Sequence, residues 1–267
     1  MFDLHVHSVF SGDGHAYIED MCAEAVKQGL SEIAFTEHVD HNPADVSYGK
    51  FELDEFCAQV DAANRKFAGK LNVLKGIEFA EPQLYPAELR AFGSDGRLDV
   101  IIGSVHWVGD VLISSDSFEG RDVEEMYLGY FNSLLQAVEM GGFDVLAHLD
   151  IVKRFGVQYV GPFQIELFRK QITAILAAAV ERKIALEVNT SGLRQPCVEA
   201  FPSIDILKLF RELGGELVTI GSDAHRIRHL GFGLADGLEL IREAGFDAVT
   251  VYRHRQPELV SIADELS

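Results

Sequence analysis

The stretch Phe2-Asp3-Leu4-His5-Val6-His7, at the start of the chain, combines a short apolar strand pattern with two histidines. Side chains at positions i and i+2 of a β-strand point to the same face, so both imidazoles can reach one ion. A similar arrangement, an apolar run followed by polar side chains that can bind metal, recurs along the chain. The later segments are Thr36-Glu37-His38, Gly76-Ile77-Glu78, Gly103-Ser104-Val105-His106, Ala147-His148-Leu149-Asp150 and Gly221-Ser222-Asp223-Ala224-His225.

Short apolar runs alternate with amphipathic segments along all 267 residues. Alternation of this kind is typical of βα units that build a parallel sheet. The expected strands are Phe2–Val6, Glu32–Phe35, Val73–Ile77, Val100–Ile102, Val145–Ala147, Ile184–Val188 and Leu217–Ile220. The expected helices are Ile18–Gln28, Leu53–Phe67, Val123–Glu139, Phe163–Glu181, Ile204–Leu213 and Leu234–Glu243. These strands predict an α/β fold that closes, or nearly closes, into a barrel.

An additional apolar run, Ala248–Tyr252, is expected to form an eighth strand or an edge. No composition break or linker divides the sequence, so a single domain over residues 1–267 is predicted. Irregular stretches should crowd around the mouth of the barrel, where active sites are built. They are His41–Lys50, Phe79–Gly96, Gly109–Arg121 and Gly192–Pro202.

The chain is acidic, with 42 Asp and Glu against 23 Lys and Arg. Proteins that bind nucleic acid concentrate Lys and Arg, so this balance argues against a nucleic acid as partner. The cysteines Cys22, Cys57 and Cys197 are widely spaced and form no CxxC pair, which fits a reducing compartment. The sequence shows neither a secretory signal pattern nor a membrane-spanning apolar run. We therefore expect a cytoplasmic protein without a membrane partner.

The histidines predict a metal centre when they are considered together. Taken singly, each histidine is more often a hydrogen-bonding residue than a metal ligand. Their placement at successive strand ends, where a barrel gathers its active site, weakens that interpretation. Glu78 could bridge two ions with one oxygen to each. His15, in the loop Ser11-Gly12-Asp13-Gly14-His15, could return to the mouth of the barrel.

These motifs resemble, in order and residue type, those of the polymerase and histidinol phosphatase (PHP) superfamily. The resemblance implies a distorted (β/α)7 barrel with a trinuclear metal centre. One ion would be held by His5, His7, Glu78 and Asp223, a second by Glu78, His106 and His148, and a third by His15, His38 and His225. The second motif often reads Asp-His in the superfamily, whereas this chain has Glu37-His38, which leaves the role of Glu37 open.

Within the superfamily, the chain length, Glu78-Phe79 and the long loop before His106 look most like stand-alone histidinol-phosphate phosphatases. The resemblance therefore implies hydrolysis of L-histidinol phosphate in histidine biosynthesis. Three divalent ions, zinc, manganese or iron, would neutralise the phosphate dianion and activate water. The expected catalytic residues are Glu78, Asp223 and His225, and Asp223, His225 or a metal-bound group could protonate the leaving oxygen.

Arginine suits a phosphate group because its planar guanidinium offers paired donors. Arg154 and Arg194 each follow a strand end and are predicted to bind the phosphate at the mouth. His41, close to His38, is predicted to touch the substrate. The cationic end of histidinol phosphate could be received by Glu81 or Asp150.

Several alternatives stay open. The substrate could be another small phosphomonoester or a nucleotide, although the acidic balance disfavours long nucleic acids. The chain could also be a metal-binding module without catalysis, against which the full ligand set counts. An amidohydrolase-type barrel would be expected to use a bridging lysine or carboxylate on a central strand, and Lys75 is the nearest lysine. The sequence contains no GxSxG motif and no convincing Cys/His pairing, which argues against a covalent route.

Overall fold

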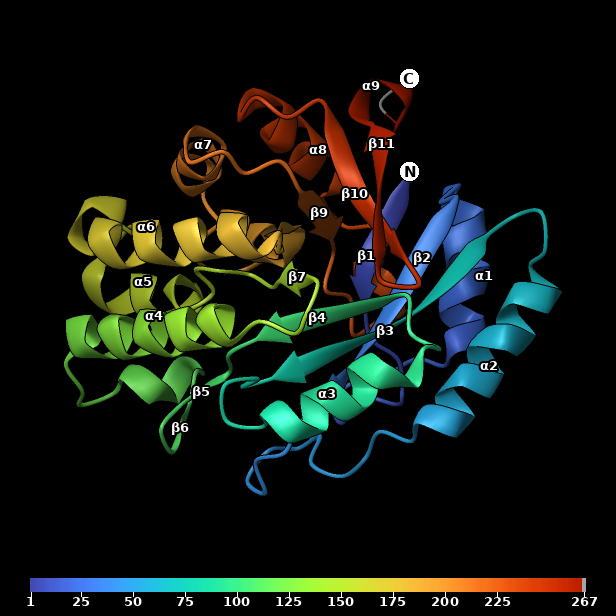
Figure 1. The fold of residues 1–267 in the computed structure, drawn as a ribbon, viewed down its shortest axis with the longest axis horizontal. Helices are drawn as coiled ribbons and strands as arrows, with labels where there is room; N and C mark the ends of the chain where they lie inside the picture. Colours follow the sequence, from blue (N-terminus) through green and yellow to red (C-terminus); the bar gives the residue numbers. More distant parts are fainter. Residues whose placement is uncertain (266–267) are drawn as a thin grey trace.

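The computed structural model describes residues 1–265, which form a barrel of seven parallel strands surrounded by helices (Figure 1). The sheet order β1-β2-β3-β4-β7-β8-β9 follows the order of the strands in the chain. Its strands are β1 Phe2–Val6, β2 Glu32–Val39, β3 Asn72–Ala80, β4 Val100–Ser104, β7 Val145–Leu146, β8 Ala185–Asn189 and β9 Val218–Gly221. The predicted distorted α/β barrel is confirmed.

The first and last strands close the barrel through backbone hydrogen bonds. His7 N donates to Ala224 O at 3.0 Å, and Asp223 N donates to His5 O at 2.8 Å. Gly221 lies in this seam, where a Cβ atom would stand 2.2 Å from the Cβ of His5. The position therefore needs glycine, and the closure brings the last sequence motif beside the first one.

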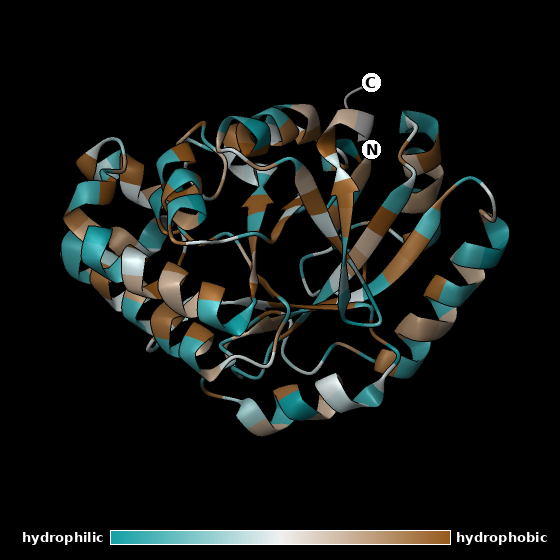
Figure 2. Ribbon diagram, turned by 45° about the horizontal axis from the view of Figure 1, so that its top comes forward, coloured by the Kyte–Doolittle hydropathy of each residue, from teal (hydrophilic) through white to brown (hydrophobic). Residues whose placement is uncertain are grey.

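Amphipathic helices cover the outside of the barrel. Helix α1 buries Ile18, Met21, Cys22 and Ala25, a spacing that places them on one face. Figure 2 shows apolar residues along the strands and hydrophilic residues on the outer helices. The helices are α1 Ile18–Gln28, α2 Leu53–Lys66, α3 Pro86–Asp95, α4 Val123–Met140, α5 Lys153–Val160, α6 Ile165–Arg182, α7 Ile204–Glu212, α8 Leu234–Glu243 and α9 Ile262–Glu265.

Three helices, α3, α5 and the short α9, were not predicted from the sequence. Helix α3 occupies part of the stretch Phe79–Gly96 that was expected to be irregular, and α5 follows the β7 strand end. Pro86 at the first turn and Gly96 in the left-handed conformation at the end of α3 are ordinary helix boundaries. Loop turns of 3₁₀ type lie at η1 Ser115–Phe118, η2 Thr190–Arg194 and η3 Ile227–His229, and a small hairpin is formed by β5 Trp107–Val108 and β6 Val111–Leu112.

The run Ala248–Tyr252 does not join the barrel sheet. Strand β10 Ala248–Arg253 instead pairs with β11 Gln256–Ser261 in a separate antiparallel hairpin. The ring of Tyr252 packs against residues at the amino ends of the central strands, and its hydroxyl donates to Asp144 O at 3.1 Å. The hairpin thus covers the amino ends of the barrel strands and leaves their carboxyl ends free. Within residues 1–265, no helix combines the length and apolarity needed to cross a bilayer.

Candidate metal centre

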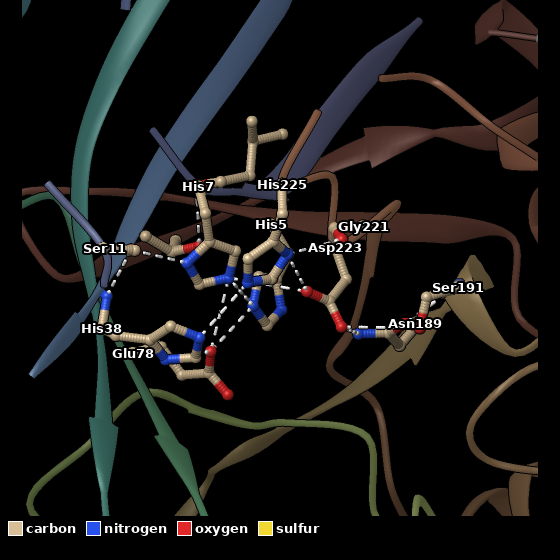
Figure 3. Close-up of polar contacts among 12 residues, drawn as sticks. His5, His7, Ser11, His38, Glu78, Asn189, Ser191, Gly221, Asp223 and His225 are labelled. Carbon is tan, nitrogen blue, oxygen red and sulfur yellow. Dashed lines mark hydrogen bonds and ion pairs between the residues drawn. The ribbon is translucent and has the colours of Figure 1, made fainter. Parts of the chain in front are cut away.

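The carboxylate of Glu78, buried on β3, is surrounded by imidazole nitrogens at the carboxyl ends of the strands (Figure 3). One oxygen, Oε2, faces three rings, and the other, Oε1, faces two. The Oε2 distances are 3.2 Å to His5 Nε2, 3.4 Å to His7 Nε2 and 3.2 Å to His38 Nδ1. The Oε1 distances are 3.2 Å to His106 Nε2 and 2.9 Å to His148 Nε2. Glu78 therefore joins the histidines of five separate positions.

The register of the parallel strands brings these side chains together. β2 and β3 extend beyond their predicted ends, so that His38 and Glu78 are direct neighbours in the parallel register. His106 and His148 follow β4 and β7. The backbone of His148 adopts a φ of 23°, and that of Asp223 a φ of 53°. Non-glycine residues rarely adopt such values, and they concentrate at functional sites.

Asp223 forms a second cluster with the histidines. Its Oδ1 lies 3.5 Å from His7 Nε2 and 3.3 Å from His225 Nδ1. The other oxygen, Oδ2, accepts a hydrogen bond from Asn189 Nδ2 at 3.2 Å. One oxygen of Asp223 is thus fixed by the protein and the other faces the ring nitrogens. Burial opposes ionisation, but the charges of His5 and His225 lower the pKa of Asp223 to about 2.

The proton positions of His5 and His7 fit a bound cation. His5 Nδ1 contacts Glu187 Oε1 at 2.5 Å, and His7 Nδ1 contacts Ser11 Oγ at 3.0 Å, while the Ser11 hydroxyl donates to Glu37. With a cation bound, each ring would be neutral and would keep its proton on Nδ1, which leaves a lone pair on each Nε2. The two Nε2 atoms face each other at 3.0 Å, an arrangement that a divalent ion between them would satisfy.

Three groups of ligand atoms lie close enough to hold divalent ions, with all atoms of a group within 4.8 Å of one another. They are His5, His7 and Asp223; His7, His38 and His225; and His38, Glu78 and His106. Burial would raise the pKa of Glu78, but the neighbouring His38, His5 and His106 hold it well below the usual value. The carboxylate is thus ionised, as a metal ligand must be.

Glu187 is a functional residue that was not singled out from the sequence. It is buried on β8, and its second oxygen accepts a hydrogen bond from His148 N at 2.8 Å. One carboxylate therefore orients two histidines of the centre. A sequence signal exists, because Glu187 interrupts the otherwise apolar run Ile184–Val188. A charged residue inside a buried strand is rarely there without a partner.

Glu37 organises the loop that carries Ser11. Its carboxylate accepts hydrogen bonds from the Ser8 hydroxyl and the Ser11 hydroxyl, both at 2.6 Å, and from Ser8 N. Ser11 in turn orients His7. Glu37 thus orients the ring of His7 through Ser11, and this is the role that the Glu37-His38 motif had left open.

His15 lies in a different place from the one expected. Its exposed ring stands 2.8 Å from Arg226 Nη2, and it belongs to none of the three ligand groups found among residues 1–265. Its backbone N–H donates to His225 O at 3.0 Å, which fixes the loop, and His15 lines the second of the two cavities described below. Asp13, in the same loop, takes the inner position, with Oδ1 3.4 Å from His225 Nε2 and 3.7 Å from His38 Nε2.

A cavity of about 280 Å³ opens over the metal-binding residues, and a second one adjoins it. Both are lined by Asp13, Arg154, Asp223 and His225. The Nε atom of Arg154 is buried without a hydrogen-bond partner. The Nε–H donor of Arg154 is therefore free for a ligand, and phosphate binding by Arg154 stays a prediction.

The other predicted substrate contacts are used within the protein. Arg194 lines the second cavity, but it donates to Ser222 O and Asp223 O at 2.8 Å each and so holds the Asp223 backbone. His41 packs against the rings of Phe79 and Tyr85, with centroids 5.2 and 5.0 Å away, and lines neither cavity. The expected position of His41 at the substrate is therefore not what the structure shows.

The two acids suggested for the cationic end of a substrate also have internal partners. Glu81 Oε1 accepts hydrogen bonds from His106 N at 2.6 Å and Trp107 N at 3.0 Å. Asp150 pairs with the buried Lys153 at 2.8 Å. Neither acid lines the cavities over the metal-binding residues. Their contacts make them structural supports.

The fold and the site together define a class: α/β barrels that collect imidazoles and carboxylates for divalent ions at the carboxyl ends of their strands. Within this class, the family model of the PHP domain matches residues 3–191. The chain belongs to the PHP domain family.

Relatives and a solved structure resemble nearly the whole chain. A histidinol-phosphatase of Lactococcus lactis is 28% identical over 94% of this chain and 93% of its own length. A probable histidinol-phosphatase of Deinococcus radiodurans is 32% identical over 95% of this chain and 97% of its own. The crystal structure of histidinol phosphate phosphatase from L. lactis, complexed with zinc, L-histidinol and phosphate, has a TM-score of 0.88 and 27% identity. It covers 96% of this chain and 98% of that chain.

Proposed function

We propose that this protein is a metal-dependent phosphatase that hydrolyses L-histidinol phosphate to L-histidinol and phosphate, a step of histidine biosynthesis. The observation that carries the proposal is the buried Glu78 carboxylate, surrounded by imidazoles beneath a cavity that Arg154 also lines. The histidinol-phosphatase relatives support the substrate, and the zinc, histidinol and phosphate of the L. lactis structure support the chemistry.

We assign three divalent ions to the centre, with zinc as the first candidate because the similar L. lactis structure contains it. The proposed ligands of the first ion are His5, His7, Glu78 and Asp223, and those of the second are Glu78, His106 and His148. For the third ion we propose His38, His225 and Asp13, because Asp13 occupies the inner position expected of His15.

Bound ions would supply positive charge to a phosphate dianion and activate water. The chain's own residues would do the positioning. Glu187 and Ser11 hold the first two imidazoles in one tautomer, and Arg194 holds the Asp223 backbone. Arg154 can donate hydrogen bonds to phosphate oxygens from the cavity wall. Asp223 and His225 both line the cavity. Proton transfer from either residue to the leaving oxygen stays a prediction.

The deciding experiment is steady-state hydrolysis of a panel of phosphomonoesters by enzyme of known metal content. We expect kcat/KM for L-histidinol phosphate to exceed that of nucleotides and sugar phosphates by at least about 100-fold, equivalent to about 2.7 kcal/mol. Similar values across the panel would replace this function by that of a general phosphomonoesterase. Absence of phosphate release at full metal occupancy would favour a binding module without catalysis.

A further inference from the structure

The two adjoining cavities differ in charge. Asp40 and Asp45 line the first one at the end of β2, whereas Arg194 and Arg226 line only the second. The residues that line both are Asp13, Arg154, Asp223 and His225. The metal-binding residues thus lie between an acidic wall and a basic wall. A ligand that is negative at one end and positive at the other would match this arrangement.

Asp40 is an acid without a partner. Its side chain is 5% exposed, its Oδ1 atom is buried without a hydrogen-bond partner, and it forms no ion pair with any described residue. A buried carboxyl group without a partner costs free energy, so it is tolerated where a ligand completes it.

Asp45, the other acid of this wall, is already satisfied. Asp45 accepts hydrogen bonds from Trp107 Nε1 at 3.0 Å and from Ser47 N at 2.8 Å. Glu81 lines neither cavity; its Oε1 accepts hydrogen bonds from the backbone N–H groups of residues 106 and 107, and its Oε2 is buried without a hydrogen-bond partner. The free oxygen on the acidic wall therefore belongs to Asp40. Leu112, Ile113 and Phe155 line the same cavity and offer apolar contact to the rest of a ligand.

We propose that Asp40 determines specificity by accepting a hydrogen bond from a protonated amino group on the alcohol part of the substrate. The inference rests on the proposed function and adds the residue that would select phosphomonoesters of amino alcohols, such as L-histidinol phosphate. Such an ester would lie with its phosphate at Arg154 and the metal-binding residues, and with its ammonium group at Asp40. The carboxylate would then gain the counter-charge that the protein does not provide.

The test compares two esters on one variant, Asp40→Asn, which keeps the size of the side chain and removes its charge. The esters are L-histidinol phosphate and its deamino analogue, which retains the imidazole ring. We expect the ratio of their kcat/KM values to fall by about 10- to 100-fold in the variant, as for loss of a charge-assisted hydrogen bond. The control is Asp110→Asn, which removes the same charge from the exposed turn between β5 and β6 and should leave the ratio as in the wild type.

The outcomes separate this inference from the proposed function. An Asp40→Asn enzyme that retains its metal and the wild-type ratio would overturn the role of Asp40 while the phosphatase function stands. An equal loss on both esters would overturn the amino group as the contacted atom. A wild-type enzyme that does not prefer L-histidinol phosphate over unrelated esters would overturn the proposed function itself, and this is measured before any variant is made.

Discussion

Carboxylates that contact the histidines, directly or through Ser11, on the side away from the cavity determine which ring nitrogen is free to bind metal. Glu187 and Glu37 line neither of the two cavities at the site, yet they fix the rings of His5 and His7, the latter through Ser11. A neutral imidazole has one donor and one acceptor nitrogen, so a fixed acceptor at Nδ1 leaves Nε2 free for a metal. Partners of this kind typically change metal affinity when they are removed.

Glu187→Gln should weaken zinc binding by about 10- to 100-fold, because the amide has a single acceptor oxygen for both His5 Nδ1 and His148 N. The measurement is competition for zinc against a chelator of known affinity. Glu216→Gln, at an exposed position, is the matched control and should bind zinc like the wild type. Equal affinity in the Glu187 variant would show that the buried carboxylate does not orient the rings.

Contacts between separate strands and helices hold the residues of the candidate site in position. The β1–β9 seam brings His5 and His7 beside Asp223, and it depends on the missing side chain of Gly221. The first turn of α5 is held by Lys153, whose buried ammonium contacts Asp150 at 2.8 Å and Glu199 at 2.7 Å. Arg154 directly follows this lysine, so the same ion pairs hold the predicted phosphate-binding residue in place.

Gly221→Ala should lower the free energy of unfolding by about 2 kcal/mol or more, because the new Cβ would overlap the Cβ of His5 at the seam. Urea denaturation of the metal-free protein measures this change. Gly29→Ala, where φ is 76° and a Cβ would meet no atom within 4 Å, should cost only about 1 kcal/mol for backbone strain. A smaller cost at Gly221 than at Gly29 would contradict the packing of the seam.

Lys153→Met should destabilise the fold by about 3–5 kcal/mol, because Asp150 would remain buried without its counter-charge. Chemical denaturation again provides the measurement, and Lys70→Met at an exposed position is the control. A change below about 1 kcal/mol would mean that Asp150 is neutral in the folded protein.

The elements that the sequence predicted well have strong hydrophobic periodicity. Helices Ile18–Gln28 and Leu234–Glu243 have the predicted bounds, and the barrel strands are recognisable as apolar runs. Helix α3 was missed because its start follows a Pro-containing loop, which reads as irregular. The strand at Ala248–Tyr252 was predicted, but its pairing with β11 was not, because an apolar run does not specify its pairing partner.

At the scale of the whole molecule, the positions of the strand ends predicted where the candidate metal site lies, but not the conformation of its loops or the residues that support it. A barrel directs the carboxyl ends of its strands to one mouth, so His5, His38, Glu78, His106 and His148 could be grouped without a structure. The conformation of the loop around Asp13 and His15 could not be predicted, because it depends on the His15 N to His225 O hydrogen bond across the mouth. The support from Glu187 requires the three-dimensional neighbourhood of β8 and β1.

The metal requirement of phosphate release tests the proposed function of the whole molecule most directly. Enzyme stripped by a chelator would be assayed with L-histidinol phosphate while zinc or manganese is added back and bound metal is measured. We expect no release without metal, recovery in step with occupancy, and a metal-bound form with a higher unfolding temperature, since a ligand at about 100 times its Kd stabilises by about 2.7 kcal/mol. Undiminished release by enzyme shown to hold no metal would contradict the metal centre built around Glu78.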